Sequence, residues 1–343
     1  MKAIILAGGS GSRLWPLSRK QYPKQLLKIE GNVSLLQSAF KRMLEITDAT
    51  NIYSITNTEH AGDVRLQLSA IENGSTVISE PTSKNTAAAI YSALKFIEQT
   101  ENENEIIVAI PCDHLINNIK DFTHSINAGV ALANNGYLVT FGVKPSYPET
   151  GYGYIQAGEI LENGYKVIKF VEKPEESLAQ NFISSDNFYW NSGIFMGKIS
   201  TFKREFQRYA QEICSSLDNI TFEPNNKIDF ASYEPIKDIS FDHAVLEHSK
   251  NIALIELNSD WADVGSWQSL YNVNAKDENG NVVLSCKYLT ESGLCGVYNK
   301  RPNVCKNYPS KTINFNGEMI DDCGYKVIKK EFKDYLYNQP KLF

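Results

Sequence analysis

The chain has 343 residues, of which 42% are hydrophobic and 22% are charged, and its formal net charge at pH 7 is -6. This length and composition predict a globular protein with one large domain and a smaller one, or with two domains. The acidic balance argues against a general nucleic-acid-binding protein, which would carry a basic surface. No apolar stretch reaches membrane-spanning length, so we expect no membrane partner.

The first residues predict a buried strand rather than an export signal. The apolar run after Lys2 ends at Gly8 and Gly9, and is therefore too short for the apolar core of a signal peptide. We therefore expect a cytoplasmic protein.

Short apolar runs alternate with segments of helical periodicity along most of the chain. Strands are predicted at residues 2–7, 51–56, 75–79, 105–110, 136–141, 166–171, 193–197 and 251–257. Helices are predicted at residues 33–46, 58–71, 86–99, 121–134 and 199–213, with Thr58 and Asp121 as N-caps. This alternation predicts an α/β fold, namely a Rossmann-like, doubly wound, mixed and mostly parallel sheet covered on both faces. Ligands bind such sheets at the carboxyl ends of the strands.

A glycine-rich, basic loop, LAGGSGSRLWPLSRKQYPKQ, begins at the end of the first predicted strand. Its Gly8, Gly9 and Gly11 match neither GxxxxGK[ST] nor GxGxxG. The backbone N–H groups of such glycines can approach phosphate oxygens, and Arg13 and Lys24 can add charge-assisted hydrogen bonds. The loop therefore predicts a phosphate-binding site, and the alternative is a tight turn with exposed basic residues.

Two carboxylates follow strands at the same predicted edge of the sheet. Asp113 comes after the apolar run EIIVAI, and Asp263 comes after NIALIEL. Because Mg²⁺ prefers one or two carboxylates together with phosphate oxygens, the two aspartates could share one metal ion. Alternatively, Asp113 could cap a turn beside a core His114, and Asp263 could lie at a helix N-terminus.

Three further runs predict contacts with a sugar. PETGYGYIQ contains Gly153, FVEKP ends a strand with Glu172 and Lys173, and YWNSGIF places Asn191 between aromatic residues. A carboxylate suits sugar hydroxyls, an ammonium group suits a phosphate, and an amide can bond in both directions. The alternative for the charged pair is an ordinary exposed strand end.

The strand–helix alternation ends at the polar stretch AKDENGN, residues 275–281. We therefore expect one domain over residues 1–280 and a separate cysteine-rich tail over residues 281–343. Thiolates in the tail could hold Zn²⁺ or iron at a tetrahedral site, or they could remain reduced and unligated. The four candidate ligands are Cys286, Cys295, Cys305 and Cys323.

Together these runs resemble the sugar-1-phosphate nucleotidyltransferases, which have the nucleotide-diphospho-sugar transferase fold, and within them the mannose-1-phosphate guanylyltransferase branch. The resemblance covers residues 1 to about 280. Departures are Lys84 where an arginine is usual, and His243 and Leu246 where tyrosine and methionine are common. It rests on the runs LAGGSGSRLWPLSR, EPTSKNTAAAI, PCDHLI, TFGVKPSYPETGYGYI, FVEKP, WNSGIF, ISFDHAVLE and WADVGSW.

The resemblance implies transfer of GMP from GTP to mannose 1-phosphate, giving GDP-mannose and pyrophosphate for polysaccharide biosynthesis. Attack on the α-phosphorus would be in line and assisted by Mg²⁺ on Asp113 and Asp263. The implied catalytic residues are Arg13, Lys24, Asp113 and Asp263. The implied nucleotide contacts are Leu6, Gly8, Gly9, Gly11, Arg13, Lys24, Glu80, Asn85, Thr86 and Asp113. The implied sugar-phosphate contacts are Gly153, Glu172, Lys173 and Asn191.

Two alternatives to this function stay open in the sequence. One is a guanylyltransferase for another sugar 1-phosphate, such as a heptose 1-phosphate, and the other is a non-catalytic metal- or redox-sensing regulator. The tail resembles the later half of small zinc- or iron-chelating CxxCxxCC proteins, and shows neither a β-helix nor a cupin isomerase pattern. We therefore expect no phosphomannose isomerase activity, and the sequence leaves a homodimer open.

Overall fold

The computed structural model describes residues 1–273, apart from 10–13, 16 and 30–31. One compact unit extends from Met1 to Val264, and a second unit begins at Gly265. The expected domain boundary near residue 280 and the cysteine-rich tail lie outside the described residues. In the described part of the chain, no helix is both long and apolar enough to cross a membrane.

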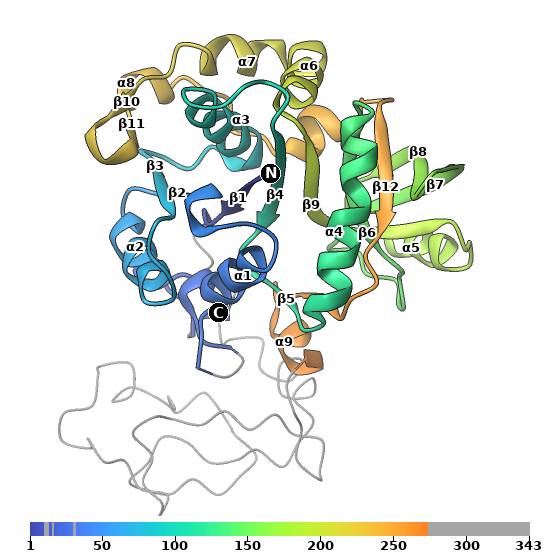
Figure 1. Ribbon diagram of the computed structural model, residues 1–343. Coiled ribbons are helices and arrows are strands. Elements are labelled where there is room, and N and C mark those ends of the chain that lie inside the picture. Colours follow the sequence, from blue (N-terminus) through green and yellow to red (C-terminus); the bar gives the residue numbers. More distant parts are fainter. Residues whose placement is uncertain (10–13, 16, 30–31, 274–343) are drawn as a thin grey trace, which may run out of the picture. The chain divides into compact units, whose positions relative to one another are not determined.

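The first unit is built on an eleven-stranded sheet in the order β10-β11-β3-β2-β1-β4-β9-β6-β12-β8-β7 (Figure 1). Each strand predicted from the sequence is present, and β7, β10 and β11 are additional. The strands are β1 (Lys2–Leu6), β2 (Ile52–Asn57), β3 (Thr76–Glu80), β4 (Ile106–Pro111), β6 (Leu138–Val143), β7 (Tyr154–Leu161), β8 (Gly164–Val171), β9 (Phe188–Lys198), β10 (Phe222–Glu223), β11 (Lys227–Ile228) and β12 (Ile252–Glu256).

The sheet is parallel where the nucleotide loop begins. Strand β1 lies between β2 and β4, with Ile4 opposite Tyr53 and Ala109. Antiparallel β9 then lies between β4 and β6. The predicted mixed α/β sheet is confirmed, and its parallel part places the ends of β1, β3 and β4 at one edge.

Helices cover both faces of the sheet because alternate strand residues point to opposite sides. Ile4 joins an apolar core with α3 (Asn85–Ile97), α6 (Ile199–Tyr209) and α7 (Gln211–Leu217). Its neighbours Ala3 and Ile5 join a second core with α1 (Leu35–Leu44), α2 (Ala61–Ser69) and α4 (Ile119–Asn134). The single helix predicted at residues 199–213 is wrong, since Ala210 leaves helical geometry with φ -136° and separates α6 from α7.

The two N-caps predicted from the sequence are also wrong. The hydroxyl of Thr58 donates to the carbonyl of Glu80 at 2.9 Å, so Thr58 joins the end of β3 and α2 begins later, at Ala61. In α4 the cap is Asn118, whose Oδ1 accepts from the backbone N–H of Asp121 at 3.2 Å. In both cases a tertiary or local hydrogen bond takes precedence over the pattern of residue types.

A separate two-stranded ribbon was not predicted. It pairs β5 (His114–Ile116) with β13 (Trp261–Asp263) in antiparallel register, with Asp263 opposite His114 and Trp261 opposite Ile116. Each strand has three residues, which is too short for a periodic signal in the sequence. The ribbon joins the chain after β4 to the chain after β12.

The close approach of β8 to β12 predicts the effect of one substitution. A Cβ at Gly164 would overlap the backbone carbonyl of Leu254, which cannot move without breaking the sheet. We expect Gly164→Ala to lower the free energy of unfolding by about 1–3 kcal/mol, as overpacking does elsewhere. Urea denaturation measures this difference.

Gly62→Ala is the matched control. Gly62 lies in α2, and a Cβ there would meet nothing within 4 Å. We expect this change to raise stability by up to about 1 kcal/mol, because alanine favours a helix over glycine. Equal effects of the two substitutions would contradict the packing argument.

Candidate active site

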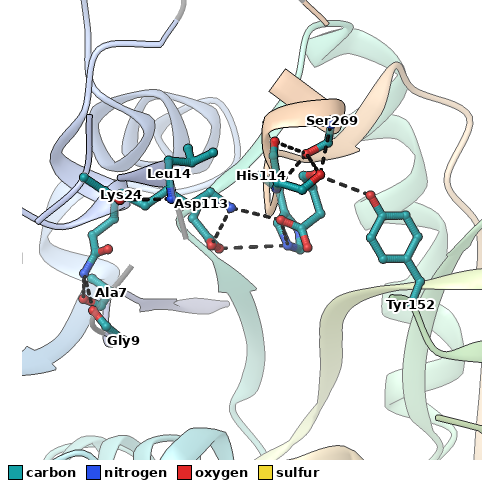
Figure 2. Close-up of polar contacts among 12 residues, drawn as sticks. Ala7, Gly9, Leu14, Lys24, Asp113, His114, Tyr152 and Ser269 are labelled. Carbon is teal, nitrogen blue, oxygen red and sulfur yellow. Dashed lines mark hydrogen bonds and ion pairs between the residues drawn. The ribbon is translucent and has the colours of Figure 1, made fainter. Parts of the chain in front are cut away.

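The glycine loop begins where β1 ends at Leu6, and one buried side chain holds its start. Gly9 has φ +99°, a conformation that glycine adopts without strain. Gln25 donates from Nε2 to the carbonyl oxygens of Ala7 at 3.0 Å and Gly9 at 3.2 Å (Figure 2). Gly8 and Gly9 themselves are exposed. The backbone of residues 7–9 is thus held by Gln25, while Gly8 and Gly9 are accessible to a ligand.

The sequence did not assign Gln25 a role, although it lies in the PKQ end of the loop motif. A single sequence does not distinguish a buried glutamine that holds the backbone from an exposed glutamine at the same position. Gly11 and Arg13, which the sequence also placed in this site, lie outside the described residues.

Lys24 joins the two aspartates predicted to hold a metal. Its Nζ lies 2.9 Å from Oδ2 of Asp113 and 2.9 Å from Oδ1 of Asp263, and its side chain is 6% exposed. Figure 2 shows the ammonium group of Lys24 beside Asp113 and His114. The three residues come from the loop after β1, the end of β4 and the β5–β13 ribbon. The fold therefore brings together side chains that are up to 239 positions apart in sequence.

The charges around Lys24 shift its pKa and that of Asp113 in opposite directions. Burial by itself would lower the pKa of Lys24, but Asp113 and Asp263 raise it above its ordinary value. Burial would raise the pKa of Asp113, but the positive charge of Lys24 and the neighbouring His114 lower it to about 2. Lys24 and Asp113 are therefore both charged at neutral pH.

His114 is held beside the carboxylates by Trp261. The indole Nε1 of Trp261 donates to Nδ1 of His114 at 3.2 Å, which leaves Nε2 to carry the ring proton. That Nε2 lies 3.9 Å from Asp113 and 4.0 Å from Asp263. Burial lowers the pKa of His114, so the neutral ring is favoured. His114 thus lies at the site, rather than in the core as its alternative interpretation required.

The carboxylate pair has the chemistry of a magnesium site that is completed by its substrate. Asp113 and Asp263 present hard oxygen ligands on one side of the glycine loop. Among the residues described, no group of three or more His, Cys, Asp or Glu side chains could hold a metal ion by itself. An ion here would need further oxygens, which phosphate groups supply.

Glu80 lies at the end of β3, below the glycine loop. It is 4% exposed, and one carboxyl oxygen accepts a hydrogen bond from the hydroxyl of the buried Tyr233. The other oxygen faces Gly8, since a Cβ there would lie 3.7 Å from it. Burial raises the pKa of Glu80 to about 8, and the bond from Tyr233 opposes part of that rise.

Asn85 and Thr86 begin α3 at the same edge. Asn85 is exposed and has φ 65°, and its Oδ1 accepts from the backbone N–H of Thr86 at 2.9 Å. Thr86 is already bonded, because its Oγ1 accepts from the backbone N–H of Phe241 at 2.8 Å. Thr86 therefore anchors a neighbouring segment, in addition to bordering the site as predicted.

The four residues predicted to contact the sugar phosphate form one cluster, just before β7, just after β8 and on β9. The carbonyl of Gly153 accepts from the backbone N–H of Asn191 at 2.8 Å. A Cβ at Gly153 would lie 2.6 Å from Oε2 of Glu172, so only glycine leaves room for that carboxylate. Lys173 Nζ lies 2.6 Å from Oε1 of Glu172, and its side chain is 58% exposed.

The structure adds Asp242 to this cluster. The side-chain Nδ2 of Asn191 donates to Oδ1 of Asp242 at 2.7 Å. Asp242 lies in the run ISFDHAVLE, which contributed to the family resemblance without any role being assigned to this residue. A single sequence cannot show that this aspartate meets a strand 51 positions earlier.

Residues 2–280 match the nucleotidyl transferase family. The chain belongs to this family. It is 37% identical over 327 residues to a mannose-1-phosphate guanylyltransferase from Salmonella muenchen, covering 92% of this chain and 67% of that protein. Among solved structures, a mannose-1-phosphate geranyltransferase from Thermus thermophilus matches with TM-score 0.73 and 27% identity, over 83% of this chain and 82% of that one. A mannose-6-phosphate isomerase from Helicobacter pylori matches with TM-score 0.65 and 28% identity, over 77% of this chain and 100% of that one.

The family membership confirms the fold and the nucleotidyltransferase chemistry that the sequence predicted. The four tail cysteines lie outside the described residues, so zinc or iron binding stays a prediction. The cytoplasmic location and the homodimer also stay predictions.

Lys24→Met tests the electrostatic role of the trio. Without the ammonium group, two neighbouring carboxylates lose their shared counter-charge. We expect the free energy of unfolding at pH 7 to fall by about 1–3 kcal/mol, less than for a fully buried pair because Asp113 is 36% exposed. Urea denaturation measures the change, and Lys20→Met is the control because Lys20 is 81% exposed. Equal stability of the two variants would contradict the role.

Glu80→Gln tests the burial of this carboxyl group through its pH dependence. The folded-state pKa of about 8 exceeds that of an unfolded glutamate, so the unfolded chain releases this proton first. The stability of the parent protein should therefore fall between about pH 5 and pH 8, by an amount on the order of a few kcal/mol that the variant lacks.

Urea denaturation of both proteins at pH 6 and pH 8.5 measures the difference. The control is Glu59→Gln, since the side chain of Glu59 is 60% exposed. If Glu80→Gln shows the same pH dependence as the parent, Glu80 is not buried as described.

Proposed function

We propose that this protein transfers GMP from GTP to mannose 1-phosphate, releasing pyrophosphate and forming GDP-mannose. The observation that carries the proposal is the convergence of Lys24, Asp113 and Asp263 beside the glycine loop. With Mg²⁺ on the two carboxylates, this group of charges suits a triphosphate. The Salmonella muenchen relative, which has this activity in its name, supports the choice of sugar and nucleotide.

The reaction needs positioning and charge neutralisation more than covalent chemistry by the protein. The backbone of Gly8 and Gly9 and the ammonium group of Lys24 would hold the triphosphate. Lys173 would hold the phosphate of mannose 1-phosphate, and the sugar ring would contact Glu172 and Asn191. A phosphate oxygen of mannose 1-phosphate then attacks the α-phosphorus, and the bond to the departing pyrophosphate breaks.

Asp113 and Asp263 would hold Mg²⁺, which would neutralise phosphate charge. Both carboxylates are already oriented by neighbours, Asp113 by Lys24 and Asp263 by Lys24 and the ribbon pairing with His114. Lys24 can share its positive charge between these carboxylates and the phosphates, because it has three N–H donors and two of them face the aspartates.

The position of Glu80 favours guanine as the base of the bound nucleotide. Guanine presents two adjacent N–H donors on one edge, and a carboxylate accepts from such an edge. The oxygen of Glu80 that faces Gly8 would receive them, while Tyr233 holds the other oxygen. Hydrogen bonds from a base would favour the ionised carboxylate and so lower the pKa of Glu80 towards its ordinary range.

The test is release of pyrophosphate from GTP and mannose 1-phosphate in the presence of Mg²⁺. We expect Asp113→Asn and Asp263→Asn each to lower kcat/KM by at least about 100-fold, the size of effect seen when a group that stabilises transition-state charge is removed. Asp63→Asn is the control, because Asp63 is an exposed carboxylate of α2, away from this site.

Three outcomes separate the alternatives. Absence of release with any sugar 1-phosphate would reject the enzyme and favour a regulator. Release with a heptose 1-phosphate in preference to mannose 1-phosphate would keep the reaction and change the sugar. Conversion of fructose 6-phosphate to mannose 6-phosphate would overturn the prediction that isomerase activity is absent, which the Helicobacter pylori match makes worth testing.

A further inference from the structure

Asp242 lies at the start of an unusual backbone segment. Residues Asp242–Leu246 form a π-helical turn, and such turns are rare and frequent at functional sites. The preceding Phe241 is fully buried, and its backbone N–H is bonded to Thr86 at the start of α3. The position of Asp242 is therefore set by the core on one side and by the nucleotide edge on the other.

The side chain of Asp242 is directed towards the sugar cluster by Asn191. The amide of Asn191 donates to Oδ1 of Asp242 at 2.7 Å, while its own Oδ1 accepts from the backbone N–H of Gly193 at 3.1 Å. The backbone of Asn191 is bonded in turn to Gly153. These bonds fix the amide of Asn191, which holds Oδ1 of the partly buried Asp242 in place.

The charges that face Asp242 come from several elements. Glu172 at the end of β8 repels it, Lys173 attracts it, and Asn191 on β9 donates to it. Burial and then the negative charge of Glu172 raise the pKa of Asp242 to about 6. Above that pH the cluster holds two carboxylates, and Lys173 is the nearby cation among the groups that act on Asp242.

We propose that Asp242 is a specificity-determining residue of the sugar-phosphate site, where it and Glu172 accept hydrogen bonds from hydroxyls of a neutral sugar ring and exclude sugar 1-phosphates that carry a second anionic group. The inference rests on the proposed function and deepens it by naming the substrate class. Lys173 offsets one phosphate, and the two carboxylates leave no counter-charge for another anion.

Asp242→Asn separates charge from shape. The amide oxygen of the substituted side chain can still accept from Asn191, whereas its NH₂ group replaces the acceptor Oδ2. At pH 8, where Asp242 is ionised, we expect the KM for mannose 1-phosphate to rise about 10-fold, with kcat and the KM for GTP nearly unchanged, because one acceptor of a substrate hydroxyl is lost.

The second substrate is mannuronic acid 1-phosphate, which differs from mannose 1-phosphate by a carboxylate at C6. Because a like charge placed beside two carboxylates costs several kcal/mol, the parent protein should discriminate against it by at least about 100-fold in kcat/KM, and Asp242→Asn should reduce that ratio about 10-fold. Glu247→Gln is the matched control, because it removes the same charge beside the same π-helical turn, where Glu247 pairs with His243. The control should leave the KM for mannose 1-phosphate and the kcat/KM ratio of the two sugars unchanged.

Equal use of the two sugars by the parent protein would overturn the inference, and so would an unchanged ratio in a folded Asp242→Asn. If Asp242→Asn does not fold, two measurements decide the question. They are the kcat/KM ratio of the two sugars for the parent protein and the same ratio for Asp242→Glu, which conserves the charge and should retain the discrimination. Calorimetry of both sugar phosphates without GTP distinguishes the two proposals. If the protein binds mannose 1-phosphate in preference to the anionic sugar but releases no pyrophosphate, the proposed reaction is rejected and the role of Asp242 is kept. If it turns over both sugars equally, the reaction is kept and the role of Asp242 is rejected.

Discussion

The contact of one lysine with two aspartates is the constraint on which the site depends. Lys24 lies 2.9 Å from both Asp113 and Asp263, and without this cation two carboxylates would face each other at the edge of the sheet. The β5–β13 ribbon makes the contact feasible, because its register places Asp263 opposite His114. A pairing of only three residues per strand therefore brings Asp263, near the end of the first unit, to the segment that follows β4 and to Lys24.

Three carboxyl groups in the site differ in pKa because their surroundings differ. The pKa of Asp113 is about 2 because Lys24 outweighs its burial, that of Asp242 is about 6 because of burial and Glu172, and that of Glu80 is about 8 because of burial. The first is suited to a permanent negative charge for a cation. The others are suited to hydrogen bonds with neutral parts of a substrate, whose N–H and O–H groups favour the charged acceptor.

The nucleotide side and the sugar side share a physical connection. Thr86, at the start of α3, accepts from the backbone of Phe241, and the next residue is Asp242 in the sugar cluster. Gln25 fixes the glycine loop in a similar way through the carbonyl of Gly9. Buried hydrogen bonds of this kind hold binding groups in place before a substrate arrives, which reduces the entropy lost on binding.

The sequence by itself determined the alternation of strands and helices, and the position of charged residues at strand ends, because both follow from periodicity within short windows. It therefore located the loop, Lys24 and Asp113, and it gave Asp263 a carboxylate role without showing how the two aspartates meet. The tertiary structure alone decided that Lys24 joins them and that Asp242 meets Asn191, since these contacts bridge distant parts of the chain. Contacts across such separations depend on strand order and on three-residue pairings, which leave no periodic signal in the sequence.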